Sequence, residues 1–126
     1  MANNEFNNID EFIDGFSRIG PASNNTKYDG IIWGIEFSYR NKIYRITRDP
    51  IGCEDQLKAK FGMSKNACIK FFEIPLKKYP DTSNIPIDLF LGIYDDVQDL
   101  LENGNIDFIP LKNIIASDET EILAID

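Results

Sequence analysis

The acidic residues between positions 95 and 102 have types and a spacing that could support chemistry. Asp95, Asp96 and Asp99 form the pattern D-D-x-x-D, and Glu102 follows three residues later. On a helix, Asp95, Asp99 and Glu102 would share one face, because residues at i, i+4 and i+7 project in similar directions. Carboxylate oxygens gathered in this way can hold Mg²⁺.

Simpler interpretations of this acidic cluster compete with a metal site. Acids at the start of a helix offset the helix macrodipole, and a charged stripe is often only a solvated face. We favour these interpretations over a metal site and expect no metal ligand and no cofactor. Contact with a basic protein partner is a better functional interpretation, so Asp95, Asp96, Asp99 and Glu102 are the predicted partner-binding residues.

The absence of histidine restricts the catalytic chemistry of the chain. Serine–histidine and cysteine–histidine pairs and histidine-ligated zinc are excluded, and the commonest general base near neutral pH is missing. Cys53 and Cys68 lack the spacing of a zinc or redox motif. We expect both cysteines to be reduced, as in a cytoplasmic protein. We therefore predict no catalytic residue, although chemistry that uses carboxylate, lysine or tyrosine stays open.

The charges are distributed unevenly along the chain, whose formal net charge is −8. Residues 79–126 contain eleven acids and one base, whereas residues 27–78 contain eleven bases and six acids. This separation predicts an acidic and a basic region in the fold. The negative net charge opposes binding to nucleic acid.

A second constellation lies in residues 39–48, where basic and aromatic residues are interleaved. Its members are Tyr39, Arg40, Lys42, Tyr44, Arg45 and Arg48. Such a set on a sheet can bind single-stranded nucleic acid through charge and stacking. However, the alternation places the tyrosines on the same face as Ile35 and Phe37, which predicts that their rings point into the core. We expect no nucleic-acid partner.

The same alternation predicts a β-hairpin at residues 31–48. Apolar side chains occupy every second position and are expected on its buried face: Trp33, Ile35, Phe37, Tyr44 and Ile46. Asn41 tolerates the left-handed backbone of a tight turn. With Arg40-Asn41 as the turn, Phe37 faces Tyr44, and Glu36 faces Arg45 on the outer surface. Gly34 indicates a bulge or a close approach by another backbone.

Helical periodicity predicts an N-terminal helix that ends at Gly20-Pro21. Residues 53–61 are predicted as a short helix stopped by Gly62, and residues 67–76 as a strand. No apolar run approaches the roughly 20 residues that span a membrane, so we expect no membrane partner.

Residues 85–103 fit two patterns. We prefer a strand at 87–93 followed by a helix at 96–103 with Asp95 as its N-cap, because Gly92 is unfavourable in the middle of a helix. The alternative is one helix from about Pro86. Residues 106–111 are predicted as a short strand, and residues 121–125 as an edge strand or a tail.

These elements predict a single α+β domain over residues 1–126, with a mostly antiparallel sheet. The N-terminal helix and two short helices are expected to pack on one side of it. We expect a non-enzymatic, cytoplasmic, acidic protein-binding module, for example a bacterial immunity protein that neutralises a basic, nuclease-type toxin. The alternatives are a small carboxylate-based enzyme or ligand-binding domain, and a phage-type inhibitor that mimics nucleic acid.

Overall fold

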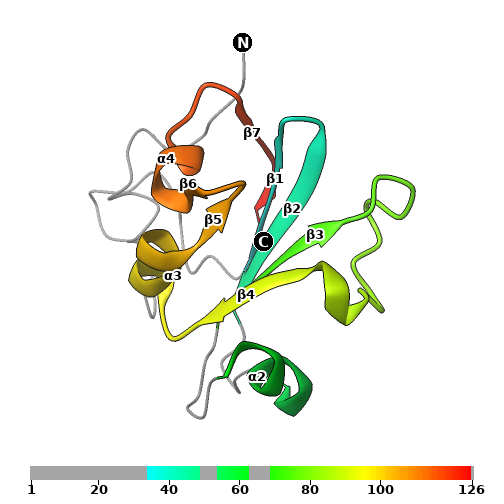
Figure 1. The fold of residues 1–126 in the computed structure, drawn as a ribbon. Coiled ribbons are helices and arrows are strands. Elements are labelled where there is room, and N and C mark those ends of the chain that lie inside the picture. The colour runs from blue at the N-terminus through cyan, green and yellow to red at the C-terminus, as the bar shows by residue number, and fades with distance from the viewer. Residues whose placement is uncertain (1–33, 49–53, 63–68, 126) are drawn as a thin grey trace, which may run out of the picture.

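The centre of the fold is a five-stranded antiparallel sheet in the strand order β4-β3-β2-β1-β7 (Figure 1). The computed structural model describes residues 34–48, 54–62 and 69–125. The five strands are β1 (Gly34–Tyr39), β2 (Lys42–Arg48), β3 (Ile69–Ile74), β4 (Phe90–Tyr94) and β7 (Thr120–Ile125). The mostly antiparallel sheet is therefore confirmed. The predicted N-terminal helix lies outside the described residues.

The β1–β2 hairpin has the predicted turn and register. Arg40 and Asn41 both adopt a positive φ, and Phe37 pairs with Tyr44 as expected. The four predicted core residues of the hairpin that the structure describes are buried: Ile35, Phe37, Tyr44 and Ile46. Trp33 lies outside the described residues. Alternation of large apolar and polar side chains is a local signal, which explains why it predicts this element well.

The remaining elements are short. They are the helices α2 (Asp55–Phe61), α3 (Val97–Asn103) and α4 (Leu111–Ile115), the 3₁₀ helix η1 (Ile87–Leu89), and the strands β5 (Asn105–Ile106) and β6 (Ile109–Pro110). The preferred strand-then-helix interpretation of residues 85–103 is confirmed, although the strand begins only at Phe90. The single strand predicted for residues 106–111 is wrong, because this segment divides between the β5–β6 hairpin and the start of α4.

The inner face of the sheet carries the main hydrophobic core. Phe37, Tyr44 and Phe71 come from three strands and form a compact aromatic cluster there, with ring centroids 5.5 to 6.4 Å apart. Helices α3 and α4 cover this face with their apolar residues: Val97, Leu100, Leu101, Leu111, Ile114 and Ile115. Figure 1 shows these two helices together with the β5–β6 hairpin on one side of the sheet. This layer positions the acidic C-terminal residues.

The outer face of the sheet is covered by other segments. Phe72 pairs with Arg45 and with Phe90, so these residues share the face opposite the main core. Leu57 of α2 packs against Ile93 in a second, smaller cluster on this face. The prediction that the short helices pack on one side is therefore wrong, since α2 lies on the face opposite α3 and α4.

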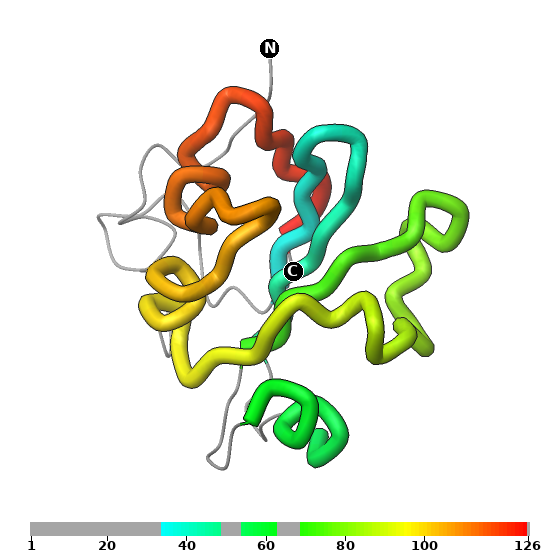
Figure 2. The backbone as a smooth tube through the Cα atoms, in the orientation of Figure 1, coloured from blue at the N-terminus to red at the C-terminus, as the bar shows by residue number. Residues whose placement is uncertain are grey.

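Strand β7 forms one edge of the sheet by pairing antiparallel with β1. In Figure 2 this C-terminal segment, drawn in red, runs beside the cyan β1. Of the two interpretations of residues 121–125, the edge strand is confirmed. Thr120 anchors its beginning, because its fully buried hydroxyl donates a hydrogen bond to the backbone oxygen of Ile114. None of the described helices combines the length and the apolar character needed to cross a membrane.

Candidate functional site

The predicted acidic cluster lies at the start of α3, where two of its members hold the helix end. The Asp96 carboxylate accepts a hydrogen bond from the Asp99 amide at 2.8 Å, so Asp96 is the N-cap. The Asp99 carboxylate accepts from the Asp95 amide at 3.2 Å and from the Asn103 side chain at 2.6 Å. The bond to Asp96 satisfies a backbone N–H group in the first turn that the helix itself leaves without a partner.

This arrangement corrects two details of the sequence interpretation. The cap is Asp96 and not Asp95, and α3 begins at Val97. Asp95 therefore lies before the helix and cannot share a helical face with Asp99 and Glu102. Among the described residues, no three acidic side chains converge closely enough to hold a metal ion. Asp95, Asp96 and Glu102 are exposed, whereas Asp99 is half-buried.

The exposed acids extend beyond this cluster over a larger surface, which we call the acidic layer. It consists of α3, the β5–β6 hairpin, α4 and the loop into β7, and these segments pack on one another. Its exposed acids are Asp95, Asp96, Glu102, Asp107, Asp118 and Glu119. Lys112 is the one base in the described part of this layer. Arg40 and Lys42 of the β1–β2 hairpin border this layer, because Arg40 pairs with Glu119 and Lys42 lines a hollow together with Asp107.

Phe108 projects from the acidic layer at the tip of the β5–β6 hairpin and is 97% exposed. It follows Asp107, and the φ angles of these two turn residues are +51° and +69°. Two positive φ angles match a type I′ turn, which strongly favours Asn-Gly or Asp-Gly. A phenylalanine in this conformation costs free energy. The sequence interpretation missed Phe108, although an aromatic residue beside an Asp in a turn is a visible signal.

The tip of the β1–β2 hairpin also contains a turn residue with a positive φ, but this residue is stabilised by contacts within the fold. Arg40 has a φ of +49°. Its Nε donates to the Glu119 carboxylate at 2.8 Å, and its guanidinium lies 5.0 Å from the centre of the Tyr39 ring. Glu119 raises the pKa of Arg40 first through this hydrogen bond and then through its charge. Arg40 therefore makes contacts within the fold, whereas the ring of Phe108 faces solvent.

A hollow of about 330 Å³ separates the β5–β6 hairpin from the edge of the inner face. Tyr44, Tyr94, Asn103 and Asp107 are among its lining residues. Burial, followed by the negative charges of Glu73 and Asp107, raises the pKa of Tyr44 to about 12. Burial also raises the pKa of Tyr94, with a smaller contribution from Asp99. Both phenols therefore stay neutral at physiological pH and give this hollow no tyrosinate base.

The basic and aromatic residues of the β1–β2 hairpin do not form a stacking platform. Tyr39 and Tyr44 are buried on the inner face, as predicted. Arg45 forms an ion pair with Glu36, and Lys42 lies 3.9 Å from the Glu73 carboxylate. Single-stranded nucleic acid needs exposed rings beside cations, and the described part of this hairpin keeps its tyrosine rings in the core.

Glu36 and Arg45 face each other across the hairpin as predicted, but they are not on an open surface. Glu36 is only 7% exposed, which corrects its predicted place on the outer surface. Arg45 donates to the Glu36 carboxylate at 2.9 Å and to the Thr47 hydroxyl at 2.7 Å. Tyr79, from the segment after β3, forms a hydrogen bond with Glu36. Burial and then the Glu36 charge raise the pKa of Tyr79.

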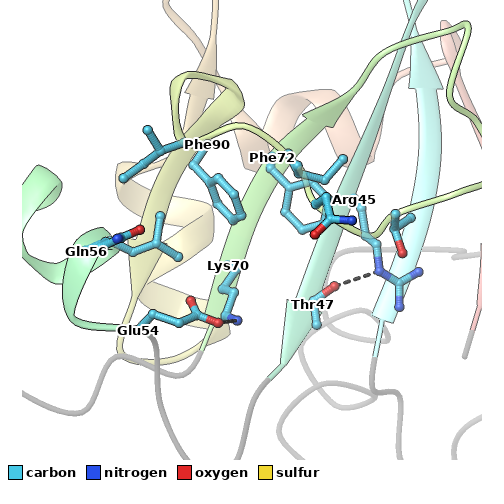
Figure 3. Close-up of a pocket in the computed structure, with 12 residues that line it drawn as sticks. Arg45, Thr47, Glu54, Gln56, Lys70, Phe72 and Phe90 are labelled. Atoms are coloured by element: carbon cyan, nitrogen blue, oxygen red, sulfur yellow. Dashed lines mark hydrogen bonds and ion pairs between the residues drawn. The ribbon is translucent and has the colours of Figure 1, made fainter.

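A cavity of about 470 Å³ opens beside this ion pair on the outer face of the sheet (Figure 3). We call it the outer-face cavity. Arg45, Thr47, Lys70 and Phe72 form its floor, while its walls come from the start of α2 and from residues 82–90. Its size falls in the usual range of ligand pockets. Sequence patterns did not reveal it, because its lining comes from segments far apart in the chain.

Two surfaces thus stand out in the described residues: the acidic layer with Phe108, and the outer-face cavity with its paired charges. A comparison of the chain with protein-family models, curated proteins and solved structures finds no match, so the functional argument rests on these two surfaces.

Proposed function

We propose that this protein is a non-enzymatic binding module whose acidic layer docks onto a basic partner protein. The predicted residues Asp95, Asp96, Asp99 and Glu102 belong to this surface, and Asp107 and Phe108 extend it. A bacterial immunity protein that neutralises a nuclease-type toxin is one example of such a module, since nuclease clefts are basic. We further propose that it acts in the cytoplasm, where Cys53 and Cys68 would stay reduced.

The observation that carries the proposal is the position of Phe108. A fully exposed phenylalanine in a left-handed turn gains no burial energy for the fold and strains the backbone. Backbone strain of this kind is concentrated at functional sites. Aromatic residues that fill a pocket on the partner are typical anchors of protein interfaces. We therefore assign Phe108 the role of anchor.

The acids around Phe108 determine which partner fits. Glu102 and Asp107 are exposed on the same layer, and the described part of the layer contains a single base. Like charges on a partner would be repelled, whereas a basic partner would be steered toward the layer and would associate faster. The partner therefore needs an apolar pocket with lysine or arginine residues around it.

An inhibitor that mimics nucleic acid is the second candidate, and it too would bind a basic surface. That candidate depends on the acids alone. The exposed ring of Phe108 favours a partner with an apolar pocket, which a phosphate-binding groove does not require. The effect of removing the ring therefore separates the two candidates.

The experiment compares three baits in an extract of the source cell. Wild-type protein, Phe108→Gly and the charge-reduced variant Glu102→Gln/Asp107→Asn are immobilised at equal density, and retained proteins are identified by mass spectrometry. We expect a basic protein on the wild-type bait that Phe108→Gly retains weakly. Equal retention of every basic protein by wild type and Phe108→Gly would refute the anchor role.

The specific case of immunity has a separate test. The protein encoded beside this chain in its genome is purified and assayed for nuclease activity with and without added chain. We expect a stoichiometric loss of its activity, which Phe108→Gly should weaken. A neighbour without toxic activity would exclude the immunity example, while the pull-down would still test the broader proposal.

A further inference from the structure

We propose that the outer-face cavity binds a small organic monocarboxylate with an aromatic or branched apolar body. This site is separate from the acidic layer. Arg45, Lys70 and Phe72 lie on the face of the sheet opposite Tyr44 and Phe71, which pack against the core under α3 and α4. Binding here would therefore leave the acidic layer accessible.

The cation that would bind the carboxylate is Lys70. Its ammonium group already holds a carboxylate, because its Nζ donates to Glu54 Oε1 at 2.7 Å. Both residues line the cavity, and Figure 3 shows the Glu54 side chain extending from the beginning of α2 toward Lys70. The Glu54 carboxylate thus marks the position beside Lys70 that a ligand carboxylate would occupy.

The two partners of this ion pair differ strongly in burial. The Lys70 side chain is 13% exposed, whereas the Glu54 side chain is 62% exposed. A largely exposed carboxylate gains little from an ion pair and loses little when it turns back to water. The largely buried Lys70 side chain, in contrast, needs a negative partner for its ammonium group. A ligand carboxylate can therefore exchange with Glu54, and Lys70 keeps a partner in both states.

Arg45 defines the charge of the ligand. Its guanidinium is held by Glu36 and Thr47, and the Glu36 side chain is 9% exposed, so this pair cannot exchange as easily. One exchangeable cation matches one carboxylate and does not match a phosphate dianion. Two of the five N–H groups of Arg45 donate to Glu36 and Thr47, and its guanidinium adds a positive potential to the cavity.

The apolar part of the lining defines the body of the ligand. Phe72 and Phe90 stand side by side with ring centroids 4.9 Å apart. Leu57, Ile85 and Ile87 complete the apolar wall. A flat or branched hydrocarbon group could pack on these side chains while its carboxylate reaches Lys70. Thr47, Gln56, Thr82 and Asn84 supply polar groups for substituents on that body.

The walls of the cavity are tied to each other without a ligand. Lys60 of α2 donates to the backbone oxygens of Ile87 and Phe90 at 2.6 and 3.1 Å. Lys78 donates to the backbone oxygen of Ser83 at 2.8 Å in the loop that leads to Asn84. A pocket held open in this way needs less ordering when a ligand binds.

The test uses phenylacetate and indole-3-acetate as probes and phenylacetamide as their neutral control. Binding to the full chain is followed by NMR titration and calorimetry. We expect saturable millimolar or tighter binding of the acids, with shifts at Lys70, Phe72 and Phe90, and at least about tenfold weaker binding of the amide.

Three variants test how Lys70 and Glu54 change the affinity for the acids. Lys70→Met should lose about tenfold or more in affinity, because the carboxylate loses its partner. Glu54→Gln should bind the acids about threefold more tightly, because the competing carboxylate is gone. Lys77→Met removes a charge from an exposed lysine outside the cavity lining and should bind like wild type.

Two outcomes would overturn the proposal. One is the absence of binding by both acids to folded wild-type protein at millimolar concentration. The other is weaker binding by Glu54→Gln, because it would show that Glu54 supports the ligand and does not compete with it. Circular dichroism shows whether Lys70→Met folds. If it does not, the Glu54→Gln result and the comparison of the acids with the amide still test whether the cavity binds a carboxylate.

Discussion

The guanidinium of Arg45 lies against the backbone of Gly34, in the space that a Cβ atom at position 34 would occupy. From there Arg45 reaches both Glu36 and Thr47. The close approach that a mid-strand glycine indicated is therefore made by a charged side chain from β2 and not by another backbone. Gly34 allows an ion pair to lie flat on the outer face of the sheet.

Replacing Gly34 with alanine should displace this guanidinium. We expect Gly34→Ala to lower the free energy of unfolding by about 1–2 kcal/mol, although alanine alone is usually better than glycine in a strand. In an Arg45→Met background the same change should be neutral or stabilising. Urea unfolding of the four proteins in this cycle measures the coupling. Equal effects of Gly34→Ala in both backgrounds would show that the contact between Arg45 and Gly34 does not contribute to stability.

The Glu36–Arg45 pair makes a second prediction, which follows from its burial. Arg45→Met alone leaves the 7%-exposed Glu36 without its ion partner and should cost about 2–4 kcal/mol. The double change Glu36→Leu/Arg45→Met should cost clearly less, because no buried charge remains unpaired. Chemical denaturation gives both values. A double variant that is less stable than Arg45→Met would indicate that the hydrogen bond from Tyr79 to Glu36 dominates this site.

The elements that could be predicted are those determined by residues close together in the sequence. The register of the β1–β2 hairpin follows from its alternation and from Asn41 in the turn. The stop of α2 at Gly62 follows in the same way, because Gly62 adopts the left-handed conformation that ends a helix. Helix α4 was missed because it is only five residues long and begins directly after Pro110.

The burial of Glu36 could not be predicted, because its cause is distant in the sequence. Strand alternation correctly places Glu36 opposite the main core, but it cannot show that Tyr79 and Phe72 will lie over that face. The outer-face cavity has the same origin in distant segments. The acidic cluster was visible in the sequence, whereas the capping roles of Asp96 and Asp99 required the exact beginning of α3.

The raised pKa of Tyr44 predicts a loss of stability in alkali. Its pKa is about 10 in the unfolded chain and about 12 in the fold, so the folded state holds the proton more tightly. The stabilisation is fully present below pH 10 and is lost as the pH rises from about 10 to 12. It amounts to about 2 kcal/mol.

The control for this prediction is Tyr44→Phe, which cannot ionise at this position. Free energies of unfolding are measured for both proteins from pH 9 to 12, a window set by the Tyr44 shift. The wild type should lose more stability than the variant over this range. Parallel curves would contradict a buried, neutral Tyr44.

Phe108→Gly should separate stability from binding. Glycine accepts the positive φ of this turn position without a steric penalty, and Asp-Gly is a favoured type I′ sequence. We therefore expect the variant to be more stable by about 0.5–1 kcal/mol, after the larger chain entropy of glycine is included. Thermal and urea unfolding provide the measurement, and Phe108→Ala is the control that removes the ring without relieving the backbone. A less stable Phe108→Gly would mean that the ring supports the fold.

The acidic layer can be tested by charge changes that leave its helix start intact. Asp96 and Asp99 cap α3, so changing them would confuse folding with binding. Glu102 and Asp107 are exposed on the same layer, and Glu102→Gln/Asp107→Asn removes two charges. The matched control, Asp55→Asn/Asp88→Asn, removes two exposed acids from α2 and η1, outside the layer.

The most direct measurement is the association rate constant of these proteins with the basic partner recovered on the wild-type bait, at low and at high salt. We predict that Glu102→Gln/Asp107→Asn associates about two- to fivefold more slowly at low salt and depends less on salt. The Asp55→Asn/Asp88→Asn control should keep the wild-type rate, and Phe108→Gly should mainly dissociate faster. Equal slowing by both charge variants would mean that only net charge matters, and unchanged rates for Glu102→Gln/Asp107→Asn would show that the partner does not dock on the acidic layer.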